Sequence, residues 1–237
     1  SNAATLNLGG NETVGALFAA FGSTNNLGAY TLTAGGNNQS YTNGALTFGS
    51  GSIVKNGKGI MYMNQSLNTY SGGFTLNDGE VAYTSSGTVT NGVLSNSVFG
   101  TGTLTLNGGT IRSSSDTSGR NIFNSVVING DVTFGSNGAA ATITVAKDAN
   151  NTTTITKDVS ITNVGSVTWE QPIVGSGFRI TKAGITSTNS GGATNLITFR
   201  ASNDIAGMTI LGGTVGYKNR NAFGTGTLIV KDGSTLG

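Results

Sequence analysis

The sequence predicts an all-β fold, a single-stranded parallel β-helix in which short strands stack coil upon coil. Three observations predict it. The hexapeptide Phe-Gly-Thr-Gly-Thr-Leu occurs at 99–104 and again at 223–228. Apolar and polar residues alternate, as at 104–106, and this alternation is typical of half-buried strands. Asn-Gly and Asp-Gly pairs separate the strands, and such pairs favour turns.

The internal repeat extends beyond the hexapeptide. Residues 73–76 and 79–83 resemble 207–210 and 213–217, with apolar residues matched to apolar ones and glycines to glycines. The first copy has extra residues between Val81 and Phe99, rich in Ser, Thr, Asn and Gly, which predicts a surface loop. The residues expected to be structural in the repeat are Tyr70, Gly73, Phe74, Leu76, Gly79, Phe99, Gly100, Gly102, Leu104, Leu106, Gly109, Phe223, Gly224, Gly226, Leu228, Val230 and Gly233.

The composition agrees with a fold made of strands and turns. The 237 residues include 39 glycines and one proline, and only 9% are charged, against about 25% in ordinary globular domains. Gly, Thr, Asn and Ser are poor helix formers, so a mainly helical fold is excluded. One stretch is ambiguous: Val14, Leu17, Phe18 and Phe21 would share a helix face with Asn11 as the cap, but a terminal cap on stacked strands fits equally well.

A solenoid follows from the shortness of the strands. A strand such as 104–106 cannot bury itself, so neighbouring units must stack to complete a core. We expect coils of roughly 20 to 25 residues with parallel pairing along the axis. An antiparallel β-sandwich and a β-propeller are the competing architectures. The turns are expected at Asn43-Gly44, Asn56-Gly57, Asp78-Gly79, Asn91-Gly92, Asn107-Gly108, Asn129-Gly130 and Asp232-Gly233.

The domain organisation is predicted to be one unit. Residues 1–3, Ser-Asn-Ala, look like the remainder of a cleaved purification tag, and 4–237 form one β-helix. The sequence stops inside a repeat unit, so we expect a fragment of a longer protein. No apolar run could act as a signal peptide or cross a membrane.

Motifs within 55–111 suggest a family. A Lys-x-Gly-x-Gly opening at 55–59 is followed by Asn-Thr-Tyr-x-Gly-Gly at 68–73 and by Gly-Thr-Gly-x-Leu-x-Leu-x-Gly-Gly-Thr at 100–110. This segment resembles the autotransporter passenger-associated transport repeat, also called the autotransporter-associated beta strand repeat. A weaker copy spans 182–236, with Lys182-Ala183-Gly184 as the opening.

The resemblance implies a right-handed parallel β-helix in a large bacterial surface-exposed or secreted protein. It implies a stalk or an adhesin rather than an activity. In true autotransporters a β-barrel anchors such a passenger, and this chain has no barrel of its own: its aromatic residues are few and dispersed. A barrel or another anchor beyond residue 237 is left open.

Several function classes are excluded by residue types. The chain has no His and no Cys, which removes a Ser-His-Asp triad, a thiol nucleophile and the usual zinc sites. The net charge of +2 is too small to indicate a nucleic-acid partner. We expect no cofactor, no metal and no nucleic acid.

Polysaccharide cleavage is the alternative to a structural role, because it needs only paired carboxylates or a suitable base. Asp78 and Glu80 are the best pair, two residues apart on one strand face, although a turn aspartate beside a solvated glutamate is the simpler interpretation. Lys147-Asp148 and Lys157-Asp158 could align on adjacent coils, or they are loop charges that limit aggregation.

Glycan contacts are the remaining candidates. Trp169, Tyr83 and Tyr217 could stack on sugar rings if they lined one surface, although matched repeat positions usually indicate core packing. The small basic clusters at 218–220 and at Lys55 and Lys58 could meet acidic glycans, but exposed turns are the simpler interpretation. The sequence therefore predicts a non-catalytic structural or adhesive segment, with extracellular glycans or cell surfaces as partners.

Overall fold

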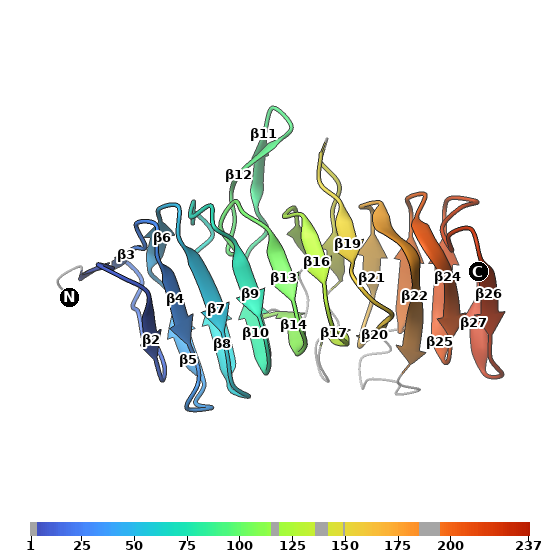
Figure 1. The fold of residues 1–237 in the computed structure, drawn as a ribbon, viewed down its shortest axis with the longest axis horizontal. Coiled ribbons are helices and arrows are strands. Elements are labelled where there is room, and N and C mark those ends of the chain that lie inside the picture. The colour runs from blue at the N-terminus through green and yellow to red at the C-terminus, as the bar shows by residue number, and fades with distance from the viewer. Residues whose placement is uncertain (1–3, 115–118, 136–141, 149, 185–194) are drawn as a thin grey trace.

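The computed structural model is a solenoid of stacked coils whose two ends lie at opposite ends of the long axis (Figure 1). It describes residues 4–237 except 115–118, 136–141, 149 and 185–194. The expected tag remainder at 1–3 lies outside the described residues. Every strand pair except one hairpin is parallel, which confirms the parallel β-helix and excludes the sandwich and the propeller. The right-handed sense stays a prediction.

The coils pass through up to three strand-bearing faces, which we name A, B and C in chain order; the coils between residues 52 and 113 have no strand on face C. Faces A and B belong to one 16-stranded sheet. The strands of face A are β2 (Glu12–Val14), β4 (Thr31–Ala34), β7 (Ser52–Lys55), β9 (Phe74–Leu76), β13 (Leu104–Leu106), β16 (Val126–Ile128) and β19 (Thr153–Ile155). The strands of face B are β5 (Tyr41–Asn43), β8 (Ile60–Met63), β10 (Glu80–Tyr83), β14 (Thr110–Ser113), β17 (Val132–Phe134) and β20 (Val159–Asn163).

Face C consists of two smaller sheets. Both follow face B and precede face A in the order of faces along the chain. The first, three-stranded, contains β1 (Thr5–Asn7), β3 (Thr24–Asn26) and β6 (Leu46–Phe48). The second, six-stranded, contains β15 (Arg120–Ile122), β18 (Ile143–Val145), β21 (Val167–Trp169), β23 (Leu196–Phe199), β25 (Gly213–Tyr217) and β27 (Ser234–Leu236).

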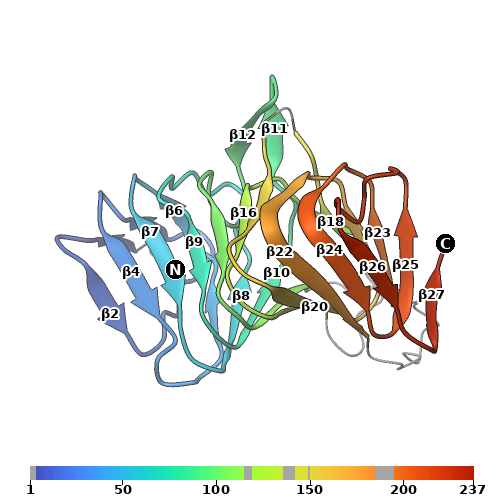
Figure 2. The ribbon, with the colours of Figure 1, turned by 45° about the vertical axis from the view of Figure 1, so that its right-hand side comes forward.

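The corner between faces A and B straightens toward the C-terminal end. The 12-residue strand β22 (Ile173–Gly184) pairs with β19 through its start and with β20 through its second half. Strand β24 (Asp204–Ile210) follows β22 across both faces, and β26 (Thr227–Val230) pairs with its second half. These strands lie side by side in Figure 2. The straightened corner therefore joins two faces into one sheet.

The interior is filled by columns of side chains, one residue from each coil. Leu104 stacks between Phe74 and Val126, and all three are buried. Alternation puts Thr105, between Leu104 and Leu106, on the outer surface. Each column gains its stacking contacts from the coils above and below, which is why repetition is needed for a core.

Two segments depart from the predicted coil. Residues 88–96 form the antiparallel hairpin β11 (Thr88–Thr90) and β12 (Val93–Asn96), which projects from the solenoid in both views (Figures 1 and 2). The surface insertion predicted between Val81 and Phe99 is therefore confirmed. The alternative of a helix over 13–21 is wrong: β2 ends at Val14 and the rest of this stretch is irregular.

Candidate functional site

The two repeat copies keep the same local structure. Gly100 and Gly224 have positive φ angles of 69° and 79°, and Gly109 and Gly233 have 82° and 79°, where a side chain would be strained. Of the predicted structural residues, Tyr70, Phe74, Leu76, Phe99, Leu104 and Leu106 are fully buried. In the second copy Phe223 and Leu228 are only partly buried, and Val230 is exposed, because no further coil covers them.

A lysine opens each copy and occupies a core column. Lys55 and Lys182 are both 0% exposed. Lys55 lies in the column of Leu76, and Lys182 lies between Ile161 and Ile210. Both interpretations of Lys55 from the sequence, a basic cluster and an exposed turn, are wrong, because the residue is buried. The shared Lys-x-Gly spacing was the signal that could have found the pair.

The buried ammonium groups bind main-chain carbonyls at a coil corner. Lys55 Nζ donates to the carbonyl oxygens of Asn56 and Gly57, at 2.8 and 2.6 Å, and reaches that of Asp78 in the next coil at 3.3 Å. Lys182 Nζ donates to Ala183 at 2.9 Å and to Gly212 of the next coil at 3.3 Å. Each lysine therefore ties a turn to the coil that follows it.

Burial changes the acid–base behaviour of both lysines. Desolvation lowers the pKa of Lys55 to about 8, and the nearby Asp78 opposes that change. Desolvation also lowers the pKa of Lys182 to about 8. Such values are typical of lysines that act as bases, but these amines are covered, so no substrate can reach them from solvent.

An exposed asparagine ladder runs along the corner between faces A and B. The amide of Asn77 donates to Asn56 at 2.7 Å, Asn107 donates to Asn77 at 2.6 Å, and Asn129 donates to Asn107 at 3.0 Å. Thr156 ends the ladder with a bond to Asn129 at 2.7 Å. Successive members are 21, 30, 22 and 27 residues apart, so the ladder aligns coils of unequal length.

A second column of amides is buried before the face A strands. Its members, Asn68, Asn124, Asn151, Gln171 and Asn203, are at most 5% exposed. Asn68 accepts from the Thr47 N–H of the preceding coil and donates to the Val98 carbonyl of the next. Asn203 does the same with Ile173 and Ala222. These side chains satisfy main-chain groups that the corner leaves unpaired.

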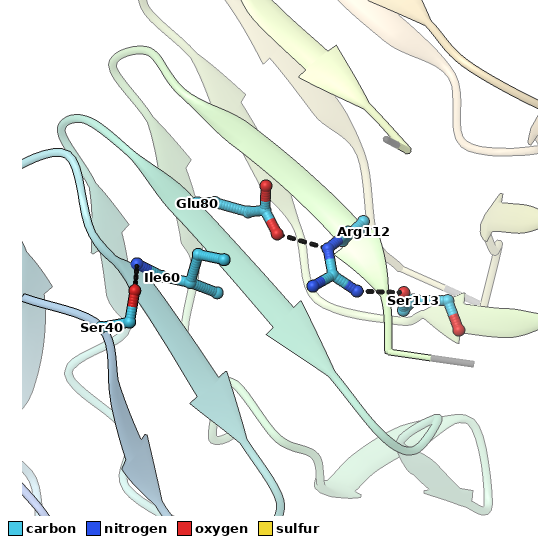
Figure 3. Close-up of polar contacts among 5 residues, drawn as sticks. All are labelled: Ser40, Ile60, Glu80, Arg112 and Ser113. Carbon is cyan, nitrogen blue, oxygen red and sulfur yellow. Dashed lines mark hydrogen bonds and ion pairs between the residues drawn. The ribbon is translucent and has the colours of Figure 1, made fainter. Parts of the chain in front are cut away.

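Asp78 and Glu80, the best candidate catalytic pair, are each bonded to another group of the fold. Asp78 Oδ1 accepts the N–H of Gly79 at 2.7 Å, a turn bond. Glu80 is ion-paired with Arg112, whose guanidinium also donates to the Ser113 carbonyl at 3.3 Å (Figure 3). Arg112 further lies 6.0 Å from the centre of the Tyr62 ring. The two carboxylates therefore have separate structural partners.

Other polar groups on faces A and B join one coil to the next. Ser40 Oγ accepts the N–H of Ile60, the first residue of β8, at 3.0 Å (Figure 3). Asp131 accepts from Ser160 and Asp158 accepts from Arg179, both at 2.8 Å. Each of these contacts joins a side chain of one coil to a main-chain N–H of a strand in the following coil.

The predicted alignment of the two Lys-Asp pairs is wrong. Asp148 follows face C and accepts from Asn150 and Asn151 within its own loop, whereas Asp158 follows face A. Lys147 and Lys157 are both exposed. The two pairs lie at different corners of one coil, so they form no joint site.

The aromatic candidates belong to the interior. Trp169 and Tyr83 are 0% exposed, so their interpretation as glycan contacts is wrong. Trp169 Nε1 donates to Thr153, and its ring packs against Phe134 and Phe199. Tyr217 continues the column of Trp169 and is 44% exposed because it lies near the end of the solenoid.

None of four hollows on the described surface contains a pair of acids. One of them, of about 600 Å³, is lined by residues such as Pro172 and Asn203 and contains one carboxylate, Asp204. Another, of about 500 Å³, lies beside the exposed rings of Phe18 and Phe21 and contains none. Lys218 and Arg220 are exposed, in agreement with the interpretation of 218–220 as an exposed turn.

The described part of the chain has neither a metal-binding cluster nor a membrane-spanning helix. No cluster of three acidic, His or Cys residues there could hold a metal ion. No helix in that part is long and apolar enough to cross a membrane. Comparison with protein families, curated proteins and solved structures finds no match to this chain.

Proposed function

We propose that this chain is a non-catalytic structural segment of a bacterial surface-exposed or secreted autotransporter-like protein. In this role the solenoid is a stiff rod that spaces or presents other parts of the protein, and it contacts cell surfaces or extracellular glycans. The compartment and the adhesive role rest on the resemblance of 55–111 to the passenger repeat.

The observation that carries the proposal is that the polar side chains bind neighbouring coils. The asparagine ladder, the buried amides and the two buried lysines all bond between coils. Ladders of this kind stabilise stacked strands without charge. A segment built in this way is suited to keeping its shape under load and in variable salt.

The state of the carboxylates supports a role without turnover. A glycosidase needs two carboxyl groups facing one substrate, whereas Asp78, Glu80, Asp131, Asp148 and Asp158 each have a structural partner. A polysaccharide-cleaving protein would have to use other residues than these.

The test is a screen against neutral and acidic polysaccharides that records both retention and new reducing or unsaturated ends. We expect no new ends, with retention by a glycan surface if the segment is adhesive and none if it is a spacer. The matched variants are Asp78→Ala and Glu80→Thr, the second giving the residue found at the equivalent position 214. We expect Asp78→Ala to cost about 1 kcal/mol, and Glu80→Thr, which leaves the part-buried Arg112 without its ion pair, about 1–3 kcal/mol.

Release of products by the wild type, abolished in either variant, would overturn the proposal. Release that persists in both variants would overturn it too and would direct the search to Asp204, the one acid that lines the 600 Å³ hollow beside Pro172. Circular dichroism of both variants shows whether a lost activity reflects lost folding.

A further inference from the structure

Five described Asn-Gly pairs share one dipeptide but have different surroundings. Asn-Gly is the sequence most prone to deamidation, because glycine leaves the next main-chain nitrogen unhindered. The intrinsic tendency of the five pairs to deamidate is therefore alike, and differences in their deamidation rates must come from the fold. The pairs begin at Asn43, Asn56, Asn91, Asn107 and Asn129.

The asparagine ladder holds three of these amides to different degrees. Asn107 donates to Asn77 and accepts from Asn129, and Asn129 likewise donates to Asn107 and accepts from Thr156. Asn56 is at the end and only accepts, from Asn77. Asn43 is 2% exposed and accepts from Asn25. To react, each of these would have to leave a coil corner that is packed against its neighbours.

Asn91 stands apart from the other four. It lies at the tip of the β11–β12 hairpin, where Asn91 and Gly92 have φ angles of 53° and 76°, the mirror-image turn that Asn-Gly favours. Asn91 is exposed, and its side chain makes no hydrogen bond within the described part of the chain. A two-stranded hairpin is marginally stable by itself, so the tip opens at little cost.

We propose that Asn91 is a spontaneous modification site, and that the asparagine ladder protects the Asn-Gly turns at Asn56, Asn107 and Asn129 from the same reaction. The deprotonated main-chain nitrogen of Gly92 attacks Cγ of Asn91, the Cγ–Nδ2 bond breaks, and ammonia leaves. Water then opens the resulting succinimide at either carbonyl and yields aspartate or isoaspartate. No other reactant is required.

The product would change the surface of the hairpin. Residues 84–103 contain no charged side chain, so each event places a first carboxylate on the arm that projects farthest from the solenoid. Isoaspartate also lengthens the main chain by one carbon, which the two-residue turn cannot accommodate. The site thus converts an uncharged, ordered arm into a negatively charged, frayed one as the protein ages.

The experiment is a peptide-mapping time course on the intact folded chain at mildly alkaline pH, with aspartate and isoaspartate measured at each Asn-Gly pair. We expect Asn91 to react about thirtyfold faster than Asn107 and Asn129, which is the factor given by two retained hydrogen bonds of ordinary net strength. Asn56 should fall between them. The pair at 137–138 lies outside the described residues and is left out of the comparison.

Two controls separate the fold from the dipeptide. In denaturant the five pairs should react at similar rates, and an equal excess at Asn91 there would overturn the role of the fold. Asn77→Ala removes one ladder contact each from Asn56 and Asn107, so both should react several-fold faster while Asn91 is unchanged. Equal rates at Asn91 and Asn107 in the folded wild type would overturn the proposal.

Discussion

The two copies of the repeat, 55–111 and 182–236, fold alike but lie on different faces of the solenoid. Phe74 and Leu104 of the first copy stack in one column of face A with Ile53, which lies just before that copy. Met208 and Leu228 of the second copy stack in the same order on face B with Ile180, which lies just before that copy. The repeat therefore specifies a strand, a corner and a stacking partner, but not a face.

The second copy lies on face B where the first lies on face A. This change of face occurs where β22 and β24 continue from face A to face B through the straightened corner. Both lysines keep their column and their carbonyl contacts in spite of it. The copies differ in how neighbouring coils cover them. The first copy has coils on both sides, whereas the last coil of the second copy has a neighbouring coil on one side only. Local conformation follows the motif, and burial follows the position in the stack.

The largest expected effect comes from a charge in the equivalent core columns. Leu104→Asp places a carboxylate at a fully buried position and should destabilise the fold by at least about 4 kcal/mol. Leu228→Asp, in the partly covered last coil, should cost about 1–2 kcal/mol and fray only that end. Urea unfolding and hydrogen exchange measure both.

Equal losses in the two leucine variants would contradict the comparison. So would loss of exchange protection over the whole chain in Leu228→Asp, because a solenoid coil contacts only its neighbours.

The next effect is the pH dependence conferred by the two buried lysines. Each has a pKa of about 8 in the folded chain against 10.5 as its ordinary value. Between these values the unfolded chain binds more protons, so stability should rise with pH from about 8 to 10, by up to about 3 kcal/mol per lysine. It is lost again as the pH falls to 8.

The matched variants are Lys55→Met and Lys182→Met, each of which should remove about half of the rise in urea-unfolding midpoint. The rise in stability should stop near pH 10. Burial raises the pKa values of Tyr41, Tyr70 and Tyr83, so above this pH these tyrosines ionise more readily in the unfolded chain than in the folded one. If the urea-unfolding midpoints of the wild type and the variants changed with pH in parallel, the two lysines would not be the source of the rise.

The smallest effect separates backbone strain from crowding. Gly109 and Gly233 occupy the same repeat position with nearly equal positive φ. A Cβ on Gly109 would lie 2.6 Å from the Gly79 carbonyl oxygen, whereas one on Gly233 would meet nothing within 4 Å. Gly233→Ala should cost about 1 kcal/mol for strain alone, and Gly109→Ala about 3 kcal/mol.

Thermal unfolding of the two alanine variants measures this difference. Equal losses would mean that the conformation of the turn, rather than the approach of the neighbouring coil, decides the cost at both sites.

Much of the architecture could be predicted because it is local. Alternation placed Leu104 and Leu106 inside, and most Asn-Gly and Asp-Gly pairs lie at coil corners, with Asn91-Gly92 as the exception at a hairpin tip. The helix alternative over 13–21 failed because its apolar spacing also suits an irregular segment, whose Phe18 and Phe21 are 69% and 78% exposed.

The candidate site was harder to predict, because exposure depends on which side chains the coils bring together. Tyr83 and Tyr217 match in the repeat, yet one is 0% and the other 44% exposed. Lys55 looks like a surface cation in sequence and is a buried one in the fold. Nothing in the spacing of Asp148 and Asp158 reveals that they lie at different corners.

Side-chain alternation and positive-φ glycines act within a few residues, so the strands, the turns and the need to stack could all be predicted from the sequence. The packing of the coils sets which face each copy occupies, which lysines are buried and which asparagines bond to one another. Those outcomes depend on the lengths of the segments between strands, which set the register of one coil on the next and are invisible to any single motif.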